Sequence, residues 1–222
     1  MPMKPSKAVD TVRKIVAKTV DTSRQSVAHR MDHLERVMQN AMMIARTCPA
    51  VDTDILAVAV LLHDVCQPCG RKAEHVDLSI ARARRILQHV GVEEAVADRV
   101  LRVISEHSTE TVEKHRPTSI EAKILFDADK LDGLGEVGIV RVFALFGQMG
   151  RPPKDAIPWY RGKIAVALQH LQTSEGRRLC RRRLPMVRRF IERLEAQFVR
   201  EKRPANNRPQ HYAGSAARHR RA

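Results

Sequence analysis

Aromatic residues and cysteines are both scarce in this chain of 222 residues. Phe, Trp and Tyr make up only 4% of the sequence, with a single Trp and two Tyr. The apolar residues are therefore mainly Ala, Val, Leu, Ile and Met, which favours packed helices over a sheet of aromatic and β-branched strands. The chain shows no secretion signal, so we expect its four cysteines, at positions 48, 66, 69 and 180, to stay reduced, as in a cytoplasmic protein.

Long apolar runs are missing as well. Between Met1 and Val20 basic residues are scattered through the sequence, without the continuous apolar region of an export signal. No segment approaches the run of about 20 apolar residues that a membrane-spanning helix needs. We therefore expect no membrane span and predict a cytoplasmic location.

Positive charge exceeds negative charge along the chain. The sequence has 40 Lys and Arg against 25 Asp and Glu, which gives a formal net charge of +15. Residues 201–222 contribute six basic residues and one Glu, so residues 1–200 still carry +10. Such a charge attracts phosphates, nucleic acids or anionic surfaces, although solvated charged faces would give the same composition.

Helical periodicity covers almost all of the chain up to residue 200, and we find no stretch with the period-two alternation of a strand. We predict an all-α fold, a compact bundle of about nine helices in one domain over residues 1–200, followed by a basic, disordered tail over 201–222. Asp52 or Thr53, and Thr118 or Ser119, are the expected N-caps of two helices. The predicted helices span residues 6–20, 24–46, 52–65, 75–90, 93–107, 118–131, 134–148, 157–173 and 176–200.

His63 and Asp64 stand side by side at the end of an apolar run that extends from Ile55 to Leu62. Two hydrophilic side chains are costly at such a position unless they are paired. A buried ionised carboxylate is tolerated next to a partner or a metal ion, and a neutral imidazole beside it suggests the metal ion. The alternative is an ordinary helix end, at which Asp64 meets solvent and His63 fills space.

Further potential metal ligands are distributed over the other predicted helices. His29 and His33 are four residues apart on one predicted helix, so they would project from the same face. Imidazoles together with carboxylates suit Mn²⁺, Fe²⁺, Zn²⁺, Ni²⁺ or Mg²⁺, and helical bundles commonly build such sites between facing helices. Each residue taken singly could equally be an ordinary core or surface residue. The other candidates are His75, His107, Asp127, Asp129 and Asp132.

The local context of these residues is distinctive. The segment 29–37 reads HRMDHLERV, residues 61–65 read LLHDV, and residues 126–134 read FDADKLDGL. Together with Gly138–Arg141 and Gly150–Pro152, these segments resemble the HD superfamily of metal-dependent phosphohydrolases, which is named after its His-Asp pair. They look like a bacterial branch of small HD hydrolases that includes nucleotide pyrophosphohydrolases. The resemblance extends from about residue 10 to residue 200.

The resemblance implies that His33, His63, Asp64 and Asp129 bind one divalent cation, with Asp127 as the alternative to Asp129 and Mn²⁺ as the favoured ion. The implied reaction is hydrolysis of a phosphoanhydride or phosphoester of a small phosphorylated substrate, such as a nucleotide, by a metal-bound hydroxide. Catalytic roles are expected for Asp64, Lys130, His107 and His75, and substrate binding for His29, Arg36, Lys130 and Arg151.

Two features leave part of this assignment open. His75 and His107 could instead complete a second metal site, as in some HD enzymes that bind two metal ions. In the alarmone (ppGpp) hydrolases of this superfamily a Glu-Asp pair follows the His-Asp pair. No acidic residue follows Asp64 closely here, which argues against that activity. The general acid or base is therefore unassigned among Glu74, Glu106 and a metal-bound hydroxide.

Arginine is concentrated near the C-terminus, where residues 177–193 include eight Arg interrupted by apolar residues at roughly helical spacing. The apolar side should pack, whereas the basic side, with the tail 201–222, could make weak contact with nucleic acid. The rival interpretation is therefore a nucleic-acid or anion-binding protein with a structural or vestigial metal site. Phosphodiesterase action on nucleic acid would combine both functions, and the sequence does not predict the oligomeric state.

Overall fold

The computed structural model describes residues 5–20, 28–66 and 74–201, and its secondary structure in these ranges is helical, without a strand. The all-α prediction is thus confirmed, and each of the nine predicted helices has a counterpart. The helices are α1 (Pro5–Val20), α2 (Met31–Ala45), α3 (Thr53–Leu62), α4 (His75–Val90), α5 (Glu94–Ser105), α6 (Thr109–Val112), α7 (Ile120–Asp132), α8 (Glu136–Gln148), α9 (Ala156–His170) and α10 (Ser174–Glu201), with a 3₁₀ turn at Pro153–Asp155.

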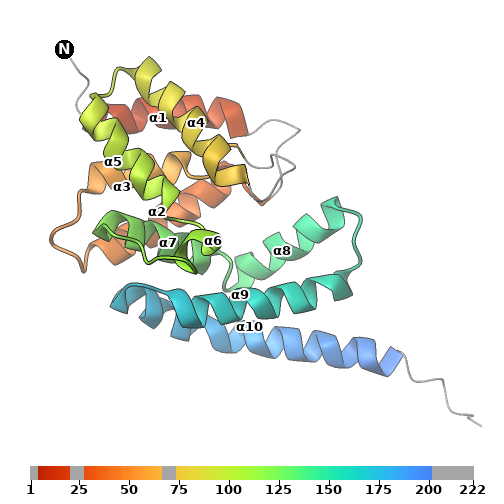
Figure 1. Ribbon diagram of the computed structural model, residues 1–222. Helices are drawn as coiled ribbons and strands as arrows, with labels where there is room; N and C mark the ends of the chain where they lie inside the picture. The colour runs from red at the N-terminus through yellow and green to blue at the C-terminus, as the bar shows by residue number, and fades with distance from the viewer. Residues whose placement is uncertain (1–4, 21–27, 67–73, 202–222) are drawn as a thin grey trace, which may run out of the picture.

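Helix α3 forms the centre of the bundle. Every side chain from Ile55 to Leu62 is buried, which explains why this helix is apolar on all sides instead of amphipathic. It packs against α1, α2, α5 and α7. In Figure 1, α1, α4 and α5 lie on one side of α2, α3 and α7, and α9 and α10 run side by side on the other.

Side-chain caps fix where α3 and α7 begin. Asp52 accepts a hydrogen bond from the backbone N–H of Ile55, and Ser119 accepts one from the backbone N–H of Ala122. Of the two residues predicted at each helix start, Asp52 and Ser119 are therefore the N-caps. The candidate ligands lie near the C-terminal ends of α3 and α7. By fixing where the two helices begin, these caps help to fix which of their residues face the site.

The helix boundaries differ most from the prediction at the start of α2, and α3 and α9 each end three residues earlier than predicted, at Leu62 and His170. The helix predicted from residue 24 begins at Met31 within the described residues, and residues 21–27 lie outside them. The stretch between α5 and α7 contains the four-residue helix α6, which Ser108 caps through the N–H of Thr111.

The predicted tail also lies outside the described residues, apart from Glu201 at the end of α10. Among the described helices, none combines the length and hydrophobicity that a membrane crossing requires.

Candidate metal centre

Asp64 lies at the centre of a group of histidines, in the turn that follows α3. Its Oδ2 atom is 3.5 Å from Nε2 of His63 and 3.9 Å from Nε2 of His33. Nε2 of His29 lies 3.9 Å from the same oxygen. The side chains of His33, His63 and Asp64 are buried, and one ligand atom from each lies within 4.8 Å of the others. This spacing allows the three residues to share one metal ion.

The other carboxylate oxygen of Asp64 faces a second pair of histidines. Oδ1 lies 3.7 Å from Nε2 of His107, and the perpendicular rings of His107 and His75 have centroids 6.0 Å apart. His75 begins α4, whereas His107 follows the C-terminus of α5. One ligand atom from each of Asp64, His75 and His107 again lies within 4.8 Å of the others. Asp64 therefore belongs to two possible ligand groups, as two neighbouring metal ions would require.

Hydrogen bonds on the far side of the rings orient three of the imidazoles. Nδ1 of His63 donates to the carbonyl oxygen of Val60 at 2.8 Å, and Nδ1 of His107 donates to that of Ile104 at 2.6 Å. Nδ1 of His33 lies 2.7 Å from a carboxylate oxygen of Asp132. Since a neutral imidazole carries one proton, each ring keeps a lone pair on Nε2 that can bind a metal ion.

Buried polar atoms without a partner mark the place where a cation fits. Nε2 of His33, Nε2 of His63 and Oδ1 of Asp64 are buried and have no hydrogen-bond partner among the described residues. Buried polar atoms are normally paired, so three such atoms on neighbouring side chains indicate an absent ligand. Imidazole nitrogens with a carboxylate form a donor set that suits Mn²⁺, Fe²⁺, Ni²⁺ or Zn²⁺. The residues present therefore fit a divalent cation.

Burial favours the neutral form of three imidazoles in the cluster, those of His29, His33 and His63. It lowers the pKa of His33 and of His63 below the ordinary value, and it lowers the pKa of His29 to about 4. Burial alone would raise the pKa of Asp64, but the neighbouring imidazoles, His63 foremost, hold that pKa well below its usual value. At neutral pH the site offers neutral nitrogens and an ionised carboxylate, which are the protonation states that bind metal ions.

Asp129 lies at the edge of this cluster. Its Oδ1 atom is 3.8 Å from Nε2 of His33, while its Oδ2 atom forms a 2.7 Å ion pair with Nζ of Lys130. Lys130 also donates to the carbonyl oxygen of His107 at 3.4 Å. Asp129 is therefore close to the first ligand group, but half of its carboxylate is paired. Its role as the fourth ligand, and that of Lys130 as a phosphate ligand, stay predictions.

Asp127, the alternative fourth ligand, is engaged elsewhere. Its carboxylate accepts hydrogen bonds from the backbone N–H groups of Gln172 and Thr173, each at 2.7 Å, and from the Thr173 hydroxyl at 2.6 Å. Asp127 thus ties α7 to the start of α10, and none of its described hydrogen bonds reaches the cluster. Glu106, a candidate proton donor, accepts hydrogen bonds from the backbone and the hydroxyl of Thr118, so its carboxylate is occupied as well.

His29 lies beside the cluster, but not for the reason that the sequence suggested. It precedes α2 instead of sharing a helix with His33, so the four-residue spacing does not explain its position. The two rings are nevertheless perpendicular neighbours, with centroids 5.8 Å apart. The side chain of His29 is 23% exposed, whereas that of His33 is 1% exposed. His29 therefore lies at the solvent side of the cluster.

Two arginines predicted to bind substrate have protein partners. Arg36 donates through Nε to Asp132 at 2.7 Å and through Nη1 to Asp32 at 2.6 Å. Arg151 lies beyond the C-terminus of α8, where its guanidinium stacks 4.7 Å from the ring centroid of Phe146. Arg151 contacts none of the cluster residues among its described interactions, and its role in substrate binding stays a prediction.

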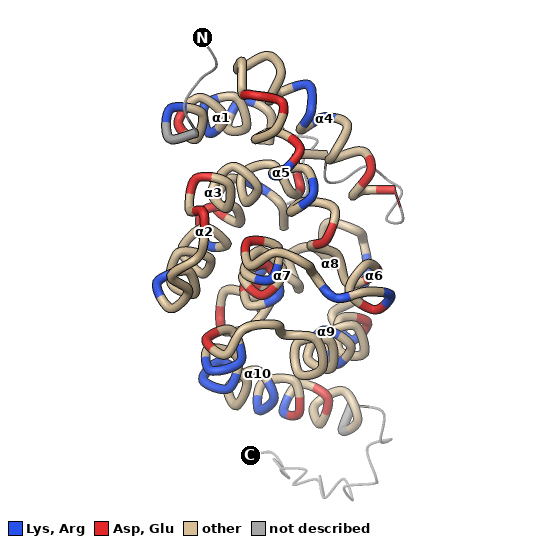
Figure 2. Tube along the Cα trace, turned by 60° about the vertical axis from the view of Figure 1, so that its left-hand side comes forward, with Lys and Arg blue, Asp and Glu red and all other residues tan. Residues whose placement is uncertain are grey.

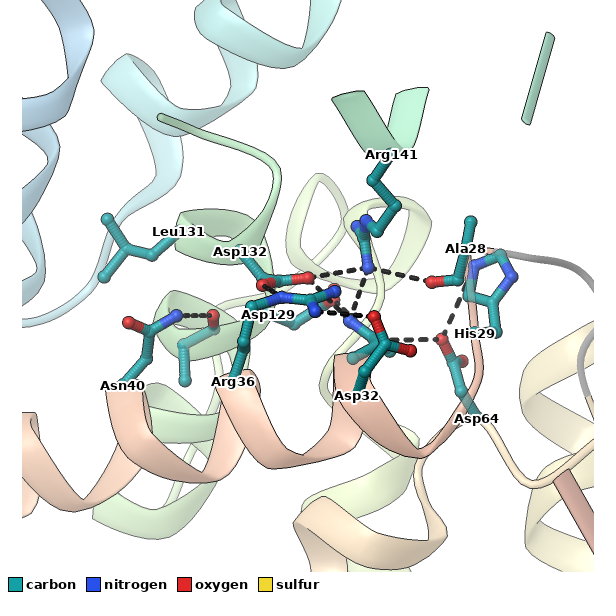
Figure 3. A network of polar contacts seen from close by, with 12 residues as sticks. Ala28, His29, Asp32, Arg36, Asn40, Asp64, Asp129, Leu131, Asp132 and Arg141 are labelled. Carbon is teal, nitrogen blue, oxygen red and sulfur yellow. Dashed lines mark hydrogen bonds and ion pairs between the residues drawn. The ribbon is translucent and has the colours of Figure 1, made fainter. Parts of the chain in front are cut away.

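The sequence indicates no site role for Arg141 and only a possible ligand role for Asp132. Figure 3 shows that the two residues complete a polar network beside the cluster. Nη1 of Arg141 lies 2.7 Å from Asp132, contacts Nδ1 of His33 and donates to the carbonyl oxygen of Ala28 at 2.9 Å. The acidic segment of α7 offered a signal for Asp132. The contact of Arg141 depends on the path of α8, which no local pattern indicated.

Comparison with known proteins agrees with this geometry. The HD domain family matches residues 30–134, a range that contains the His63-Asp64 pair. The uncharacterized protein YpgQ of Bacillus subtilis (strain 168) is 30% identical over 177 residues, which cover 77% of this chain and 85% of YpgQ. The crystal structure of YpgQ in complex with ADP matches with a TM-score of 0.66 at 26% identity, over 85% of this chain and 97% of that chain.

Two further solved structures share the fold. A protein from Lactobacillus plantarum matches with a TM-score of 0.72 at 20% identity, over 89% of this chain and 100% of its own. A protein described as a predicted HD superfamily hydrolase, from an uncultured Thermotogales bacterium, matches with a TM-score of 0.56 at 27% identity, over 87% of this chain and 92% of its own. The family match, the relatives and the His-Asp cluster agree, and the chain belongs to the HD superfamily, whose hydrolase fold it has.

Proposed function

We propose that this protein is a metal-dependent phosphohydrolase that cleaves a phosphoanhydride or phosphoester of a small phosphorylated substrate. The observation that carries this proposal is the buried carboxylate of Asp64, which faces His33 and His63 through one oxygen and His107 through the other. A purely structural metal site has all its coordination positions filled by protein ligands, whereas a catalytic site keeps a position open to water or substrate. Here the side chains of His29 and Asp129 are 23% and 16% exposed, so the cluster can be reached by a substrate.

In this proposal His33, His63 and Asp64 hold one divalent cation, with Asp129 as its fourth ligand and Mn²⁺ as the favoured ion. When bound, such a cation lowers the pKa of a water molecule and neutralises negative charge that develops on the phosphate. Lys130, beside Asp129, provides an ammonium group that can contact phosphate oxygens. His29 is at the solvent side, where its imidazole can hydrogen-bond to a phosphate oxygen or to the leaving group.

A nucleotide is the favoured class of substrate. The crystal structure of YpgQ contains ADP, and that protein is 26% identical to this chain. The formal net charge of +15 also favours the approach of polyanionic substrates. The reaction would then belong to the nucleotide pyrophosphatase or phosphodiesterase type, and the released product distinguishes these possibilities.

A substrate screen with the purified protein and Mn²⁺ tests the proposal. Nucleoside diphosphates and triphosphates, cyclic nucleotides and pyrophosphate are offered, and release of phosphate and of pyrophosphate is measured separately. We expect Mn²⁺-dependent hydrolysis of at least one nucleotide, and a loss of about 100-fold or more in kcat/KM for Asp64→Asn. The control is Asp98→Asn, whose exposed carboxylate pairs with Arg84. Absence of hydrolysis by the metal-loaded protein, or full activity of Asp64→Asn, would overturn the proposal.

A second candidate function is the binding of nucleic acid or another large anion, and the surface of α10 supports it. Basic residues recur along this helix in Figure 2, and Arg181 and Arg182 are exposed. A cavity of about 570 Å³ lies beside the start of α10, and Lys114, Arg116 and Arg177 are among the residues that line it. Salt-dependent binding of an oligonucleotide that is weakened by substituting both Arg181 and Arg182 with Ala, at unchanged hydrolysis, would support this function. No binding at low salt would exclude it.

A further inference from the structure

Asp132, the last residue of α7, is buried between donor groups from two other helices. Its Oδ2 atom lies 2.7 Å from Nδ1 of His33 and 2.7 Å from Nη1 of Arg141, and its Oδ1 atom lies 2.7 Å from Nε of Arg36. Its side chain is 3% exposed. In Figure 3, Arg141 descends from α8 and Arg36 rises from α2, so that the carboxylate is held between them.

We propose that Asp132 is a positioning residue of the metal centre. It holds His33 in the tautomer whose Nε2 atom can bind the cation, and Arg36 and Arg141 hold Asp132 in place. The inference rests on the metal-dependent function proposed above, because it assigns a role in assembling that site.

The tautomer of His33 follows from the chemistry of its partner. An ionised carboxylate only accepts hydrogen bonds, so Nδ1 of His33 carries the proton of the pair with Asp132. A neutral imidazole has a single N–H, and Nε2 is therefore left with a lone pair. Nε2 lies 3.9 Å from Asp64 and 3.8 Å from Asp129, and no described group hydrogen-bonds to it. Asp132 thus determines which ring nitrogen faces the other ligands.

The position of Arg141 makes the carboxylate of Asp132 necessary for the Nδ1–H tautomer of His33. Its Nη1 atom contacts Nδ1 of His33 as well as Asp132. A guanidinium can only donate, so without Asp132 it would donate to Nδ1 and the single ring proton would move to Nε2. That tautomer cannot offer Nε2 to a cation. With Asp132 present, Nη1 of Arg141 can donate to the carboxylate instead of to Nδ1, and the metal-binding tautomer is kept.

The hydrogen-bond acceptor that orients His33 differs in kind from the acceptors that orient His63 and His107. Nδ1 of His63 and Nδ1 of His107 donate to backbone carbonyl oxygens, those of Val60 and Ile104. A backbone acceptor is present whatever the sequence, whereas the acceptor for His33 belongs to one side chain. Partners on the far side of a ligand ring typically change metal affinity or activity by about 10-fold to 100-fold when they are removed. The orientation of His33 can therefore be tested by a single substitution.

The two arginines have the positions that this role requires. Burying a lone carboxylate is costly, and two guanidinium groups offset that cost. Arg141 also donates to the carbonyl oxygen of Ala28 at 2.9 Å, and Arg36 also pairs with Asp32. Asp132 is thus fixed to the segment before α2, to α2 itself and to α8. Arg36 serves in this arrangement as an anchor of Asp132, in place of the substrate contact that the sequence suggested.

Two substitutions at Asp132 test the inference. Asp132→Ala removes the acceptor, whereas Asp132→Asn keeps an oxygen that can accept from His33 but lacks the charge. The tautomer of His33 is read in the metal-free protein by long-range ¹H–¹⁵N NMR, and the affinity for Mn²⁺ by calorimetry. For Asp132→Ala we expect the Nε2–H tautomer and Mn²⁺ binding weaker by about 10-fold to 100-fold. For Asp132→Asn we expect the Nδ1–H tautomer, with Mn²⁺ binding weaker by about 10-fold.

Asp127→Asn is the matched control. Asp127 is another buried carboxylate of α7, but it bonds to Gln172 and Thr173 and not to the cluster. This variant should be less stable while keeping the tautomer and Mn²⁺ affinity of the wild type. The inference is overturned if Asp127→Asn reproduces the changes of Asp132→Ala, or if both Asp132 variants keep wild-type Mn²⁺ affinity. Should Asp132→Ala fail to fold, wild-type affinity in Asp132→Asn alone overturns it. Neither readout uses a substrate, so an absence of hydrolysis counts only against the proposed function.

Discussion

His63 and Asp64 are neighbours in the chain, yet their side chains turn toward the same point, with Nε2 of His63 and Oδ2 of Asp64 3.5 Å apart. Consecutive residues of an α-helix point about 100° apart, so a continuing helix would tend to separate them. The pair lies just after the last residue of α3, Leu62, where a turn begins. The hydrogen bond from Nδ1 of His63 to Val60 then holds the ring toward Asp64. The pair thus offers two potential ligand atoms to the same point.

A divalent cation should therefore stabilise the folded protein. A ligand that binds only the folded state adds about 2.7 kcal/mol to the free energy of unfolding at a concentration of 100 times its Kd. For a domain of this size we expect Mn²⁺ to raise the Tm by about 5–10 °C, and EDTA to reverse the rise. Circular dichroism melts with and without Mn²⁺ measure the effect. Asp64→Ala should gain no stability from Mn²⁺, because it lacks the shared carboxylate.

The control for this measurement is Asp98→Ala, which removes an exposed carboxylate that pairs with Arg84 and has no described contact with the cluster. This variant should respond to Mn²⁺ like the wild type. An equal rise in Tm for Asp64→Ala would show that the ion binds elsewhere on the protein.

The sharing of Asp64 between two ligand groups predicts two bound metal ions. One group consists of His33, His63 and Asp64, and the other of Asp64, His75 and His107. We expect about two equivalents of Mn²⁺ per chain at saturation in the wild type, and about one in His75→Ala, which leaves the first group intact. Metal analysis after gel filtration in Mn²⁺ provides the count. A single equivalent in both proteins would restrict the site to one ion.

Much of the fold could be predicted because its signals are local. The apolar run before His63, the capping residues and the breaks each depend on a few neighbouring residues, and all nine predicted helices have counterparts. The start of α2 was missed because the periodicity upstream of Met31 looked helical, while His29 lies in the turn before the helix. The helix α6 was missed because a single turn is too short to show periodicity.

The site was only partly predictable for a physical reason. The resemblance to HD proteins named His33 and the His63-Asp64 pair, and the structure brings these three together. The interaction partners of the charged residues around them depend on tertiary packing. Asp127 and Asp129 are two residues apart on α7, but one bonds to the start of α10 and the other approaches His33. No spacing in the sequence indicates which side of α7 each neighbouring helix covers.

Acid should destabilise the metal-free protein over a defined pH range. The pKa of His29 is about 4 in the folded protein against an ordinary value of 6.5, and burial also lowers the pKa of His33 and His63. Between these values the unfolded chain binds more protons than the folded one, so stability present above pH 6.5 is lost as the pH falls toward 4. For His29 alone the loss is on the order of 3 kcal/mol. Urea denaturation in the presence of EDTA at a series of pH values measures the free energy of unfolding.

His29→Gln isolates the contribution of that imidazole. The variant should show a shallower loss of stability between pH 6.5 and 4, because one of the buried titrating groups is gone. His89→Gln, which changes an exposed histidine of α4, should follow the wild-type curve. Identical curves for His29→Gln and the wild type would contradict the assignment.

Gly176, in the first turn of α10, permits the close approach of this helix to Asp127. A Cβ atom at this position would collide with Oδ2 of Asp127 and lie 2.8 Å from Oγ1 of Thr173, two atoms that hydrogen-bond to each other. We expect Gly176→Ala to lower the free energy of unfolding by about 1–3 kcal/mol, as overpacking of a buried contact does. Its affinity for Mn²⁺ should be unchanged. The control is Gly162→Ala in α9, where a Cβ would meet no atom within 4 Å and the gain in helix propensity should stabilise the protein slightly. Equal stability of the two variants, measured by urea denaturation, would show that α10 can move away from α7 without cost.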